Sequence, residues 1–253
     1  MEKVCLTGLF PEEIVEKLSL SQSFRGKQIF KWIYSHTNEF SKMSNLSKDL
    51  RDLLENNAII RSSTVNQVLK DPDGTIKLQI KLCDGLFIET VLLTDKNDRK
   101  TACVSCQAGC AMKCAFCQTG TLGLARNLSA GEIIEQFMYL EEEAGTLDNI
   151  VFMGVGEPFN NYENAVGAAK LLNGGPPVGL GIGARKITIS TCGIVPGIKK
   201  FADEGYQFEL SVSLHAPSNL LRDKIMPINR RWKLEELMAT CREYEEKTNR
   251  IIT

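Results

Sequence analysis

The sequence predicts an α/β protein whose core is a parallel sheet or a partial (β/α) barrel, incomplete at the C-terminus, with a small helical N-terminal domain and a short antiparallel β segment. Three observations lead to this prediction. Apolar residues recur at helical spacing in residues 1–60, Asp-Gly turns separate β-rich runs in residues 61–96, and strand-like and helix-like runs alternate in residues 97–253. Alternating βα units place an active site at the C-terminal ends of their strands.

The N-terminal helical region carries a local excess of positive charge. Between Lys17 and Arg51 there are seven Lys or Arg residues and two acidic residues. Such an excess can bind phosphate groups even though the whole chain has a net charge of -1. Residues 1–60 are therefore expected to form a nucleic-acid-binding accessory domain, with Arg25, Lys27 and Lys31 as its candidate contacts.

Aromatic residues are interleaved with this basic segment. Their spacing is helical, so we expect them to form the core stripe of a helix rather than platforms on which bases stack. These residues are Phe24, Phe30, Trp32 and Tyr34. A second basic group, Arg230, Arg231 and Lys233 around Trp232, is either a further phosphate contact or a solvated helix start.

Residues 61–96 are expected to form a β-meander that links the two domains, because TVNQVLK, TIKLQIKL and LFIETVLL are separated by DPDG and CDG.

The alternation of predicted strands and helices begins at Thr101. Its predicted strands are TACVSCQ, NIVFMGV, RKITIST and FELSVSL, and its predicted helices are SAGEIIEQFMYLEEEA, YENAVGAAKLLN, VPGIKKFADEG and LEELMATCREYEEK. The final RIIT is expected to open a fifth strand, so the βα series is expected to continue beyond the last residue.

Composition excludes several classes of protein. No run reaches the ~20 apolar residues of a membrane span, and glutamates occupy the position where a signal peptide would be apolar. We therefore expect a cytoplasmic protein without a membrane partner. Nine cysteines in such a chain argue against a structural disulfide framework and favour metal or redox chemistry.

Three of these cysteines, Cys110, Cys114 and Cys117, form the pattern C-x3-C-x2-C in a loop after the first strand of the βα series. Three thiolates on a short loop can each bind one iron of a cubane cluster and leave the fourth iron open. The pattern resembles the radical S-adenosylmethionine (SAM) superfamily, in which the amino and carboxylate groups of SAM bind that open iron. Phe116 before the last cysteine matches the usual form of the motif.

A zinc site is the alternative interpretation of the same region. Cys103, Cys106, Cys114 and Cys117 read as C-x2-C-x7-C-x2-C, which suits tetrahedral zinc. That interpretation leaves Cys110 without a role and ignores the position of the loop at the catalytic end of a βα series. The iron-sulfur cluster is therefore the favoured prediction.

Three predicted strands end in residues that suit a ligand. MGVGEP contains Gly156 and Glu157, whose carboxylate could accept a hydrogen bond from an ammonium group. STCG begins with Ser190, and SLHAP begins with Ser213, Leu214 and His215. Each element alone is more typical of a turn, a cap or an ordinary polar residue, but a shared position at C-terminal strand ends makes them candidates for a ligand site.

Together the motifs are specific to one family. The chain closely resembles the dual-specificity adenine-C2 RNA methyltransferases of the RlmN type, from about residue 6 to the last residue. The segments that carry this resemblance are FRGKQIFKWIY, IETVLL, CVSCQAGCAMKCAFCQTG, RNLSAGEIIEQ, MGVGEPFNNYENA, ARKITISTCGIVPGIKK, SLHAPSNLLRDKIMPIN and EYEEKTNRIIT.

The resemblance implies a role for each matching residue. Cys110, Cys114 and Cys117 would hold a [4Fe-4S] cluster, and the strand-end residues would contact SAM. Glu89 matches a proton acceptor, and Cys103 matches a cysteine that helps to resolve a covalent protein-RNA intermediate. The residues expected at SAM are Gly156, Glu157, Ser190, Ser213, Leu214 and His215. Cys106 departs from the Ser or Thr more usual in the family.

The resemblance also implies the reaction and its partners. The substrates would be 23S rRNA and tRNA, modified next to the anticodon in the latter, and the reductant would be a protein such as flavodoxin or ferredoxin acting on a monomer. C2 of adenine has no nucleophilic lone pair, so a radical formed from SAM would perform the difficult step. In the family, one SAM first methylates a further cysteine, which is expected to lie beyond the position of Thr253.

Two other functions are compatible with these features. A truncated homologue could bind the cluster, SAM or RNA without catalysing methylation, because the methyl-carrying cysteine is expected outside the chain. A zinc-stabilised RNA-binding module without chemistry is compatible with the two C-x2-C pairs.

Overall fold

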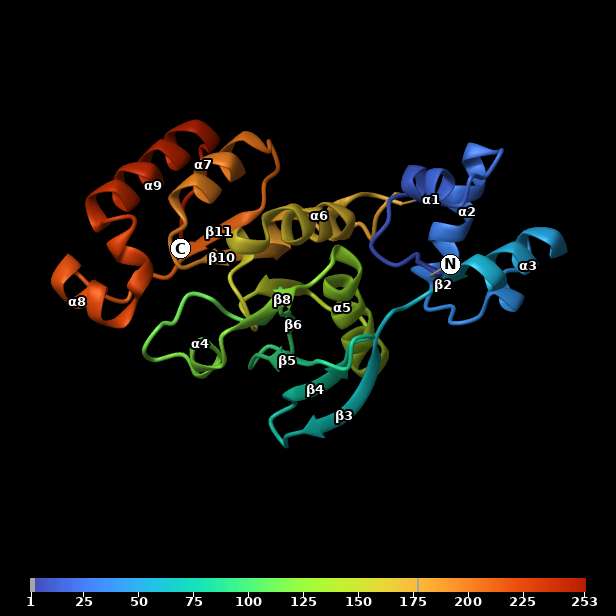
Figure 1. The fold of residues 1–253 in the computed structure, drawn as a ribbon, viewed down its shortest axis with the longest axis horizontal. Helices are drawn as coiled ribbons and strands as arrows, with labels where there is room; N and C mark the ends of the chain where they lie inside the picture. The colour runs from blue at the N-terminus through green and yellow to red at the C-terminus, as the bar shows by residue number, and fades with distance from the viewer. Residues whose placement is uncertain (1–2, 177) are drawn as a thin grey trace.

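The computed structural model describes residues 3–176 and 178–253, and its longest axis runs from the N-terminal helices to the C-terminal helices (Figure 1). The described residues form one seven-stranded sheet between these two ends. In spatial order its strands are β11 (Glu209–Val212), β10 (Ile187–Thr191), β9 (Asn149–Phe152), β6 (Lys100–Cys103), β5 (Phe87–Thr94), β4 (Ile76–Lys81) and β3 (Thr64–Lys70). None of the described helices has the length and apolar character needed to cross a membrane.

The sheet has a parallel half and an antiparallel half. Strands β6, β9, β10 and β11 pair in parallel, as expected of βα units, whereas β3, β4, β5 and β6 pair antiparallel. The sequence predicts that residues 61–96 form a β-meander linking two domains, whereas in the structure this meander is part of the core sheet. Because Val91 of β5 pairs with Cys103 of β6, the meander continues the core sheet.

The helices of the βα series follow the parallel strands in chain order. They are α5 (Ala130–Ala144), α6 (Tyr162–Asn173), α7 (Val195–Asp203) and α9 (Leu234–Thr248). α5 begins as the sequence predicts, because Ser129 accepts from the backbone of Glu132 while the Glu132 side chain accepts from Ser129. The prediction of an α/β fold with a partial (β/α) barrel is confirmed.

Alternation along the strands separates two faces of the parallel half. Ala102, Ile150, Ile189 and Leu210 have at most 1% exposure and belong to the hydrophobic core. The residues between them are only partly buried and form an inner face that carries the polar candidates. Burying one face fixes the register, since a shift by one residue would exchange the two faces.

Three elements were not foreseen from the sequence. A short hairpin joins β7 (Gln107–Gly109) to β8 (Leu124–Asn127), α4 (Gln118–Leu122) lies within it, and α8 (Asn219–Ile225) follows β11. Both helices are shorter than two full turns and both hairpin strands are short, so the spacing of apolar residues does not predict them well. The last residue also pairs with β11, since Thr253 N donates to Leu210 O at 3.1 Å.

The N-terminal domain contains α1 (Pro11–Lys17), α2 (Ser23–Ile33) and α3 (Lys48–Asn57), and a two-stranded sheet of β1 (Val4–Cys5) and β2 (Ala58–Ile59). The prediction that the aromatic residues of this domain form the core stripe of a helix is partly correct. Phe30 is buried, and Trp32 and Tyr34 pack against the core. Phe24 is 49% exposed, with the Arg25 guanidinium 4.9 Å from its ring centroid, so the core assignment is wrong for Phe24.

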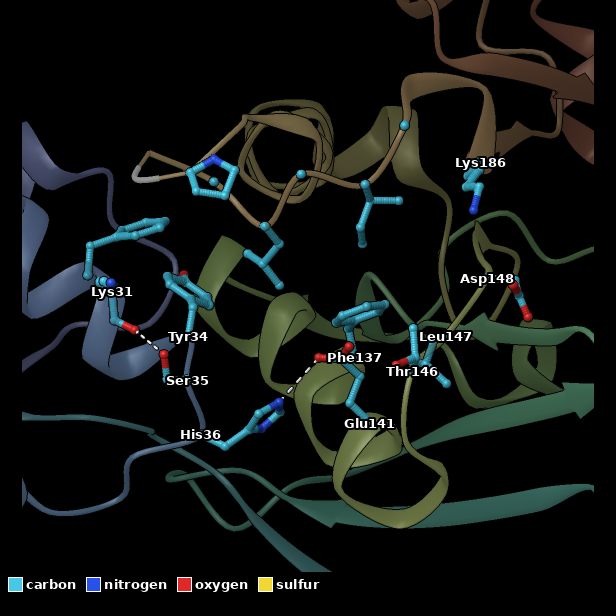
Figure 2. Close-up of a pocket in the computed structure, with 17 residues that line it drawn as sticks. Lys31, Tyr34, Ser35, His36, Phe137, Glu141, Thr146, Leu147, Asp148 and Lys186 are labelled. Carbon is cyan, nitrogen blue, oxygen red and sulfur yellow. Dashed lines mark hydrogen bonds and ion pairs between the residues drawn. The ribbon is translucent and has the colours of Figure 1, made fainter.

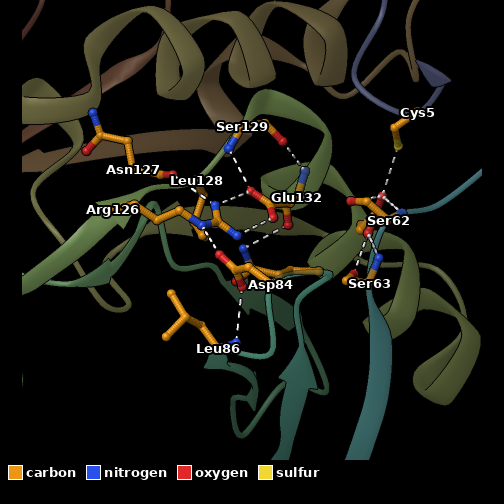
Figure 3. A network of polar contacts seen from close by, with 12 residues as sticks. Cys5, Ser62, Ser63, Asp84, Leu86, Arg126, Asn127, Leu128, Ser129 and Glu132 are labelled. Atoms are coloured by element: carbon orange, nitrogen blue, oxygen red, sulfur yellow. Dashed lines mark hydrogen bonds and ion pairs between the residues drawn. The ribbon is translucent and has the colours of Figure 1, made fainter. Parts of the chain in front are cut away.

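A buried carboxylate joins the N-terminal domain to the core. Glu135 of α5 accepts from the backbone N–H of Ser62 at 2.7 Å and of Ser63 at 3.0 Å, and both serine hydroxyls donate to it as well. Figure 3 shows Ser62 and Ser63 together with Cys5, whose thiol lies 3.6 Å from the same carboxylate. Burial is the main reason why the pKa of Glu135 lies above its ordinary value.

A second polar cluster near α5 attaches the hairpin strand β8. Arg126 forms a bidentate pair with Glu132, both N–O distances being 2.8 Å, and it also contacts Asp84 in the turn between β4 and β5 (Figure 3). The N-terminus of α5 therefore anchors segments from the meander and the hairpin.

Two backbones meet directly where the N-terminal domain contacts α5. A Cβ added at Gly131 would lie 2.3 Å from Thr7 O, and one added at Gly8, whose φ is +90°, would lie 2.2 Å from Gly131 N. Only glycine permits such an approach at both positions.

We predict that Gly131→Ala lowers the free energy of unfolding by about 1–3 kcal/mol, because its Cβ has no space beside the Thr7 carbonyl. Gly167→Ala in α6 is the matched control, since a Cβ there meets nothing within 4 Å. The control should raise stability by about 0.5–1 kcal/mol through helix propensity. Urea unfolding of both variants checks the pair, and equal effects would contradict the close contact.

Candidate functional site

The predicted cluster and SAM residues, apart from Leu214, line one cavity at the C-terminal ends of β9, β10 and β11. Its volume is about 280 Å³. Its walls include Cys110, Cys114, Cys117, Gly156, Glu157, Ser190, Ser213 and His215, together with Phe116, Thr191, Cys192 and Met226. Leu214 lies beside it and faces a neighbouring groove.

The cysteine loop is fixed at its start by the hairpin. Cys110 N donates to Gly123 O at 2.8 Å, and Gly109 has a φ of +80° with its Cα so close to Gly123 that a Cβ would lie 2.0 Å from Gly123 O. Cys117 N donates to Cys114 O at 3.1 Å, which closes the turn before α4. The three thiols are thus presented by backbone that is bonded at both ends.

The donor set fits an iron-sulfur cluster. All nine cysteines are described and none is bonded to another. In residues 3–176 and 178–253 no three ligand side chains converge as they would around one metal ion. Three thiols on the wall of one cavity suit a cluster in which each thiolate binds a different iron. Cys103 and Cys106 do not line this cavity, so the alternative zinc grouping is not formed in the described part of the chain.

Burial makes two of the cluster cysteines, Cys110 and Cys114, weaker acids than an ordinary cysteine. It raises the pKa of Cys114 to about 11, an effect to which the neighbouring Cys110 and Cys117 add. Burial also raises the pKa of Cys110. Binding of iron must displace these protons, because only thiolates act as ligands.

Glu157 is a buried carboxylate whose oxygens are already engaged. It accepts from Thr191 Oγ1 at 2.7 Å, from Cys192 N at 2.7 Å and from Phe159 N at 3.1 Å. Burial raises the pKa of Glu157, and these hydrogen bonds oppose that shift. The side chain therefore joins the end of β9 to the end of β10 within the cavity wall.

The glycines beside Glu157 allow its loop to pack closely against residues 104–107. A Cβ at Gly154 would lie 2.8 Å from Val104 O, and one at Gly156, whose φ is +108°, would lie 2.8 Å from Gln107 N. Gln107 also accepts from Glu157 N at 2.9 Å. Packing between segments thus accounts for the glycines, in addition to the approach of a ligand that the sequence suggested.

His215 has an unusual backbone conformation at the mouth of the cavity. Its φ is +56°, a left-handed value that is uncommon outside glycine. Its ring lies 4.5 Å, centroid to centroid, from the ring of Phe116 in the cysteine loop. This contact brings the end of β11 to the cluster motif.

Glu89 and Cys103 lie on the inner face but outside the cavity. Cys103 pairs with Val91, and Glu89 is two residues from Val91, so alternation places all three on one face of the sheet. Glu89 forms an ion pair with Lys77 at 3.0 Å. Burial raises the pKa of Cys103.

Larger cavities lie elsewhere. One of about 690 Å³ separates α2 from α5, and Pro176 and residues 179–183 also line it. Figure 2 shows Lys31, Tyr34 and His36 on its N-terminal side and Phe137 and Glu141 on the side of α5. This cavity holds none of the cluster or SAM candidates.

Sequence reasoning missed two buried polar residues next to the site. Arg222 and Asn229 have 0% exposure, and Arg222 is the largest of the fully buried side chains. Both belong to the segment RDKIMPIN, which was noticed only as part of a resemblance. Arginine is usually exposed, so the sequence alone does not predict that Arg222, in the middle of a short helix, is buried.

Comparison with known families agrees with this geometry. The profile of the Radical SAM superfamily matches residues 104–253. The chain belongs to the radical SAM superfamily. A second profile, the ribosomal RNA large subunit methyltransferase N-terminal domain, matches residues 14–60.

Individual relatives define the family further. A probable dual-specificity RNA methyltransferase RlmN of Treponema denticola is 51% identical over 99% of this chain and 72% of its own length. The RlmN protein of Treponema pallidum strain Nichols is 46% identical over the whole chain and 74% of its own length. A crystal structure of a radical SAM methyltransferase from Sphaerobacter thermophilus has a TM-score of 0.91 and 41% identity over 98% of this chain and 74% of that one.

These relatives place the radical SAM chain in the RlmN family of RNA methyltransferases, and the cofactors of that family are a [4Fe-4S] cluster and SAM. The chain spans about three quarters of the length of the relatives.

We predict that Glu157→Ala destabilises the metal-free chain by about 1–3 kcal/mol, because three buried donors lose their acceptor. Glu163→Ala on α6 is the control, since its side chain is 81% exposed and its ion pair with Lys200 contributes little. Urea unfolding without iron or SAM checks the prediction. Unchanged stability of the Glu157 variant would show that the carboxylate does not join the strand ends.

Proposed function

We propose that this radical SAM chain methylates C2 of adenosine in 23S rRNA and in tRNA next to the anticodon. One observation carries the proposal: Cys110, Cys114 and Cys117 and the strand-end residues other than Leu214 line a single cavity in a chain closely related to dual-specificity RNA methyltransferases. The proposal includes a cytoplasmic monomer that receives electrons from a protein such as flavodoxin or ferredoxin.

The proposed role of each residue in cofactor binding agrees with its position in or beside the cavity. Cys110, Cys114 and Cys117 would hold the cluster. Gly156, Glu157, Ser190, Ser213, Leu214 and His215 would surround SAM. When bound, the cluster supplies the electron with which SAM yields a carbon radical, a step that no side chain can perform. The chain's own residues orient SAM and separate the site from the core.

Glu89 and Cys103 would handle protons and the covalent adduct. Both lie on the inner face of the sheet, as Ser190 does by its pairing with Ser211 of β11. Burial raises the pKa of Cys103 above that of an ordinary thiol, so a base would have to remove its proton before it can react. Glu89 is exposed and can exchange protons with solvent or substrate.

The N-terminal domain would bind RNA. Phe24, Lys27 and Lys31 of α2 are exposed and spaced i, i+3 and i+7, so they share one face of the helix. Arg25 lies over the Phe24 ring at the edge of this face. In this proposal residues 1–60 are the RNA-binding accessory domain, residues 61–96 the meander and residues 97–253 the radical SAM core.

The reaction is tested with the chain joined to the portion of the Treponema denticola relative that the match leaves uncovered. After anaerobic reconstitution, the protein is incubated with SAM, a reductant, and 23S rRNA or tRNA, and digested RNA is analysed by mass spectrometry. We expect 2-methyladenosine in both RNAs, and none with Cys114→Ala, which also loses its iron. Absence of 2-methyladenosine from a protein that holds iron and cleaves SAM would refute the proposal.

The RNA surface is tested by charge removal. Replacing Arg25, Lys27 and Lys31 by alanine should weaken tRNA binding and lower the slope of log Kd against log salt by about 2–3, because each phosphate contact contributes about 0.9. Alanine at Lys70, Lys199 and Lys247 is the control, since these lysines are similarly exposed and pair with acidic residues elsewhere. Equal slopes for the two triple variants would place the RNA surface elsewhere.

A further inference from the structure

Arg222 is a buried cation beside the cofactor cavity. It lies in α8, between the β11 strand end and the 3-10 helix Pro227–Arg230, and none of its surface is exposed. A side chain with no exposure cannot touch a ligand in the cavity. Its influence on the site must act through the groups it contacts and through its charge.

Its hydrogen bonds reach the ends of two neighbouring strands. Nη2 donates to Cys192 O at 2.7 Å and to Ser213 O at 3.1 Å, and Nε donates to Leu214 O at 3.1 Å. These carbonyls belong to the segments that follow β10 and β11 and carry the SAM candidates. Arg222 therefore fixes the backbone of the Ser213-Leu214-His215 tripeptide, in which His215 has its left-handed conformation.

The remaining hydrogen bond of the Arg222 side chain also goes to a neutral acceptor. Nη1 donates to Asn229 Oδ1 at 3.1 Å. The nearby carboxylate of Asp223 is engaged by Asn229 and by Lys233. Within residues 3–176 and 178–253, no carboxylate forms an ion pair with Arg222. The Asp223 carboxylate acts on Arg222 through its charge without contacting it, yet burial still lowers the pKa of the Arg222 guanidinium. A buried charge bonded mainly to neutral groups is costly, so a further negative charge nearby would stabilise it.

The cysteine loop is attached to the same helix. Ala115 N, between Cys114 and Cys117, donates to Ile225 O at 2.8 Å, and Ile225 lies one helical turn from Arg222. The thiols of Cys114 and Cys192 are among the titratable groups that act electrostatically on Arg222. α8 thus connects the cluster motif to the strand ends that face SAM.

We propose that Arg222 is a positioning residue for both cofactors: its fixed positive charge offsets the negative charge of the thiolate-bound cluster, and its hydrogen bonds set the strand-end carbonyls beside SAM. A [4Fe-4S] cluster with three thiolates gains one further negative charge when it is reduced. A nearby fixed cation favours the reduced form, so it raises the reduction potential. This inference rests on cluster and SAM binding in the proposed function.

The experiment compares Arg222→Met, Arg222→Lys and the parent chain after anaerobic reconstitution with iron and sulfide. Arg222→Met removes charge and donors, whereas Arg222→Lys loses the planar set of donors but keeps a positive charge in the reconstituted protein, because the negative cluster favours the ammonium form. Midpoint potential is measured by redox titration followed by electron paramagnetic resonance, and the Kd for SAM by equilibrium dialysis. We expect a lower potential in Arg222→Met only, and a Kd raised about tenfold in both, equivalent to about 1.4 kcal/mol.

Lys224→Met is the matched control, because Lys224 lies two residues away on the same helix and is exposed. It should leave both quantities at the parent values. An Arg222→Met potential and Kd equal to those of the parent would overturn the inference, as would an equal drop in potential in the lysine variant or the control. Loss of the folded state in both Arg222 variants, seen by circular dichroism, would assign Arg222 to stability alone. A parent chain that binds no cluster would instead refute the proposed function.

Discussion

The parallel pairing of β6, β9, β10 and β11 is the constraint on which the site depends. Their register aligns the points at which the strands end, so residues from distant parts of the chain meet around one cavity. The apolar outer residues hold that register, because a shift by one position would place them on the inner face. The chemistry of one face is thus maintained by the packing of the other.

Two buried ionisable side chains complete this arrangement. Glu157 gathers donors from the ends of β9 and β10, whereas Arg222 gathers carbonyls from the ends of β10 and β11. Strand ends lack the full ladder of backbone hydrogen bonds, so side chains must satisfy the remaining donors and acceptors. Hydrogen bonds within the protein therefore hold the strand ends that form the cavity wall.

Sequence reasoning was strongest where a helical pattern is long, as in α5, and where candidate residues share a position at C-terminal strand ends. It failed where burial depends on tertiary contacts. Phe24 has the spacing of a core residue but projects from the helix, and Arg222 has the composition of a surface residue but is enclosed. The meander gave correct strands, yet their union with the core sheet depends on pairing between β5 and β6 that no local pattern contains.

The contact between Gly8 and Gly131 has a mechanical consequence for substrate choice. Side chains can rotate to absorb a displacement, but two backbones in contact cannot, so α5 and the N-terminal domain move together at this point. The α2 face proposed to bind RNA belongs to the same domain as Gly8, so this contact limits how far that face can move relative to the cavity. If RNA phosphates bind that face, the distance from it to the cavity would limit which adenosines along the RNA can reach the site.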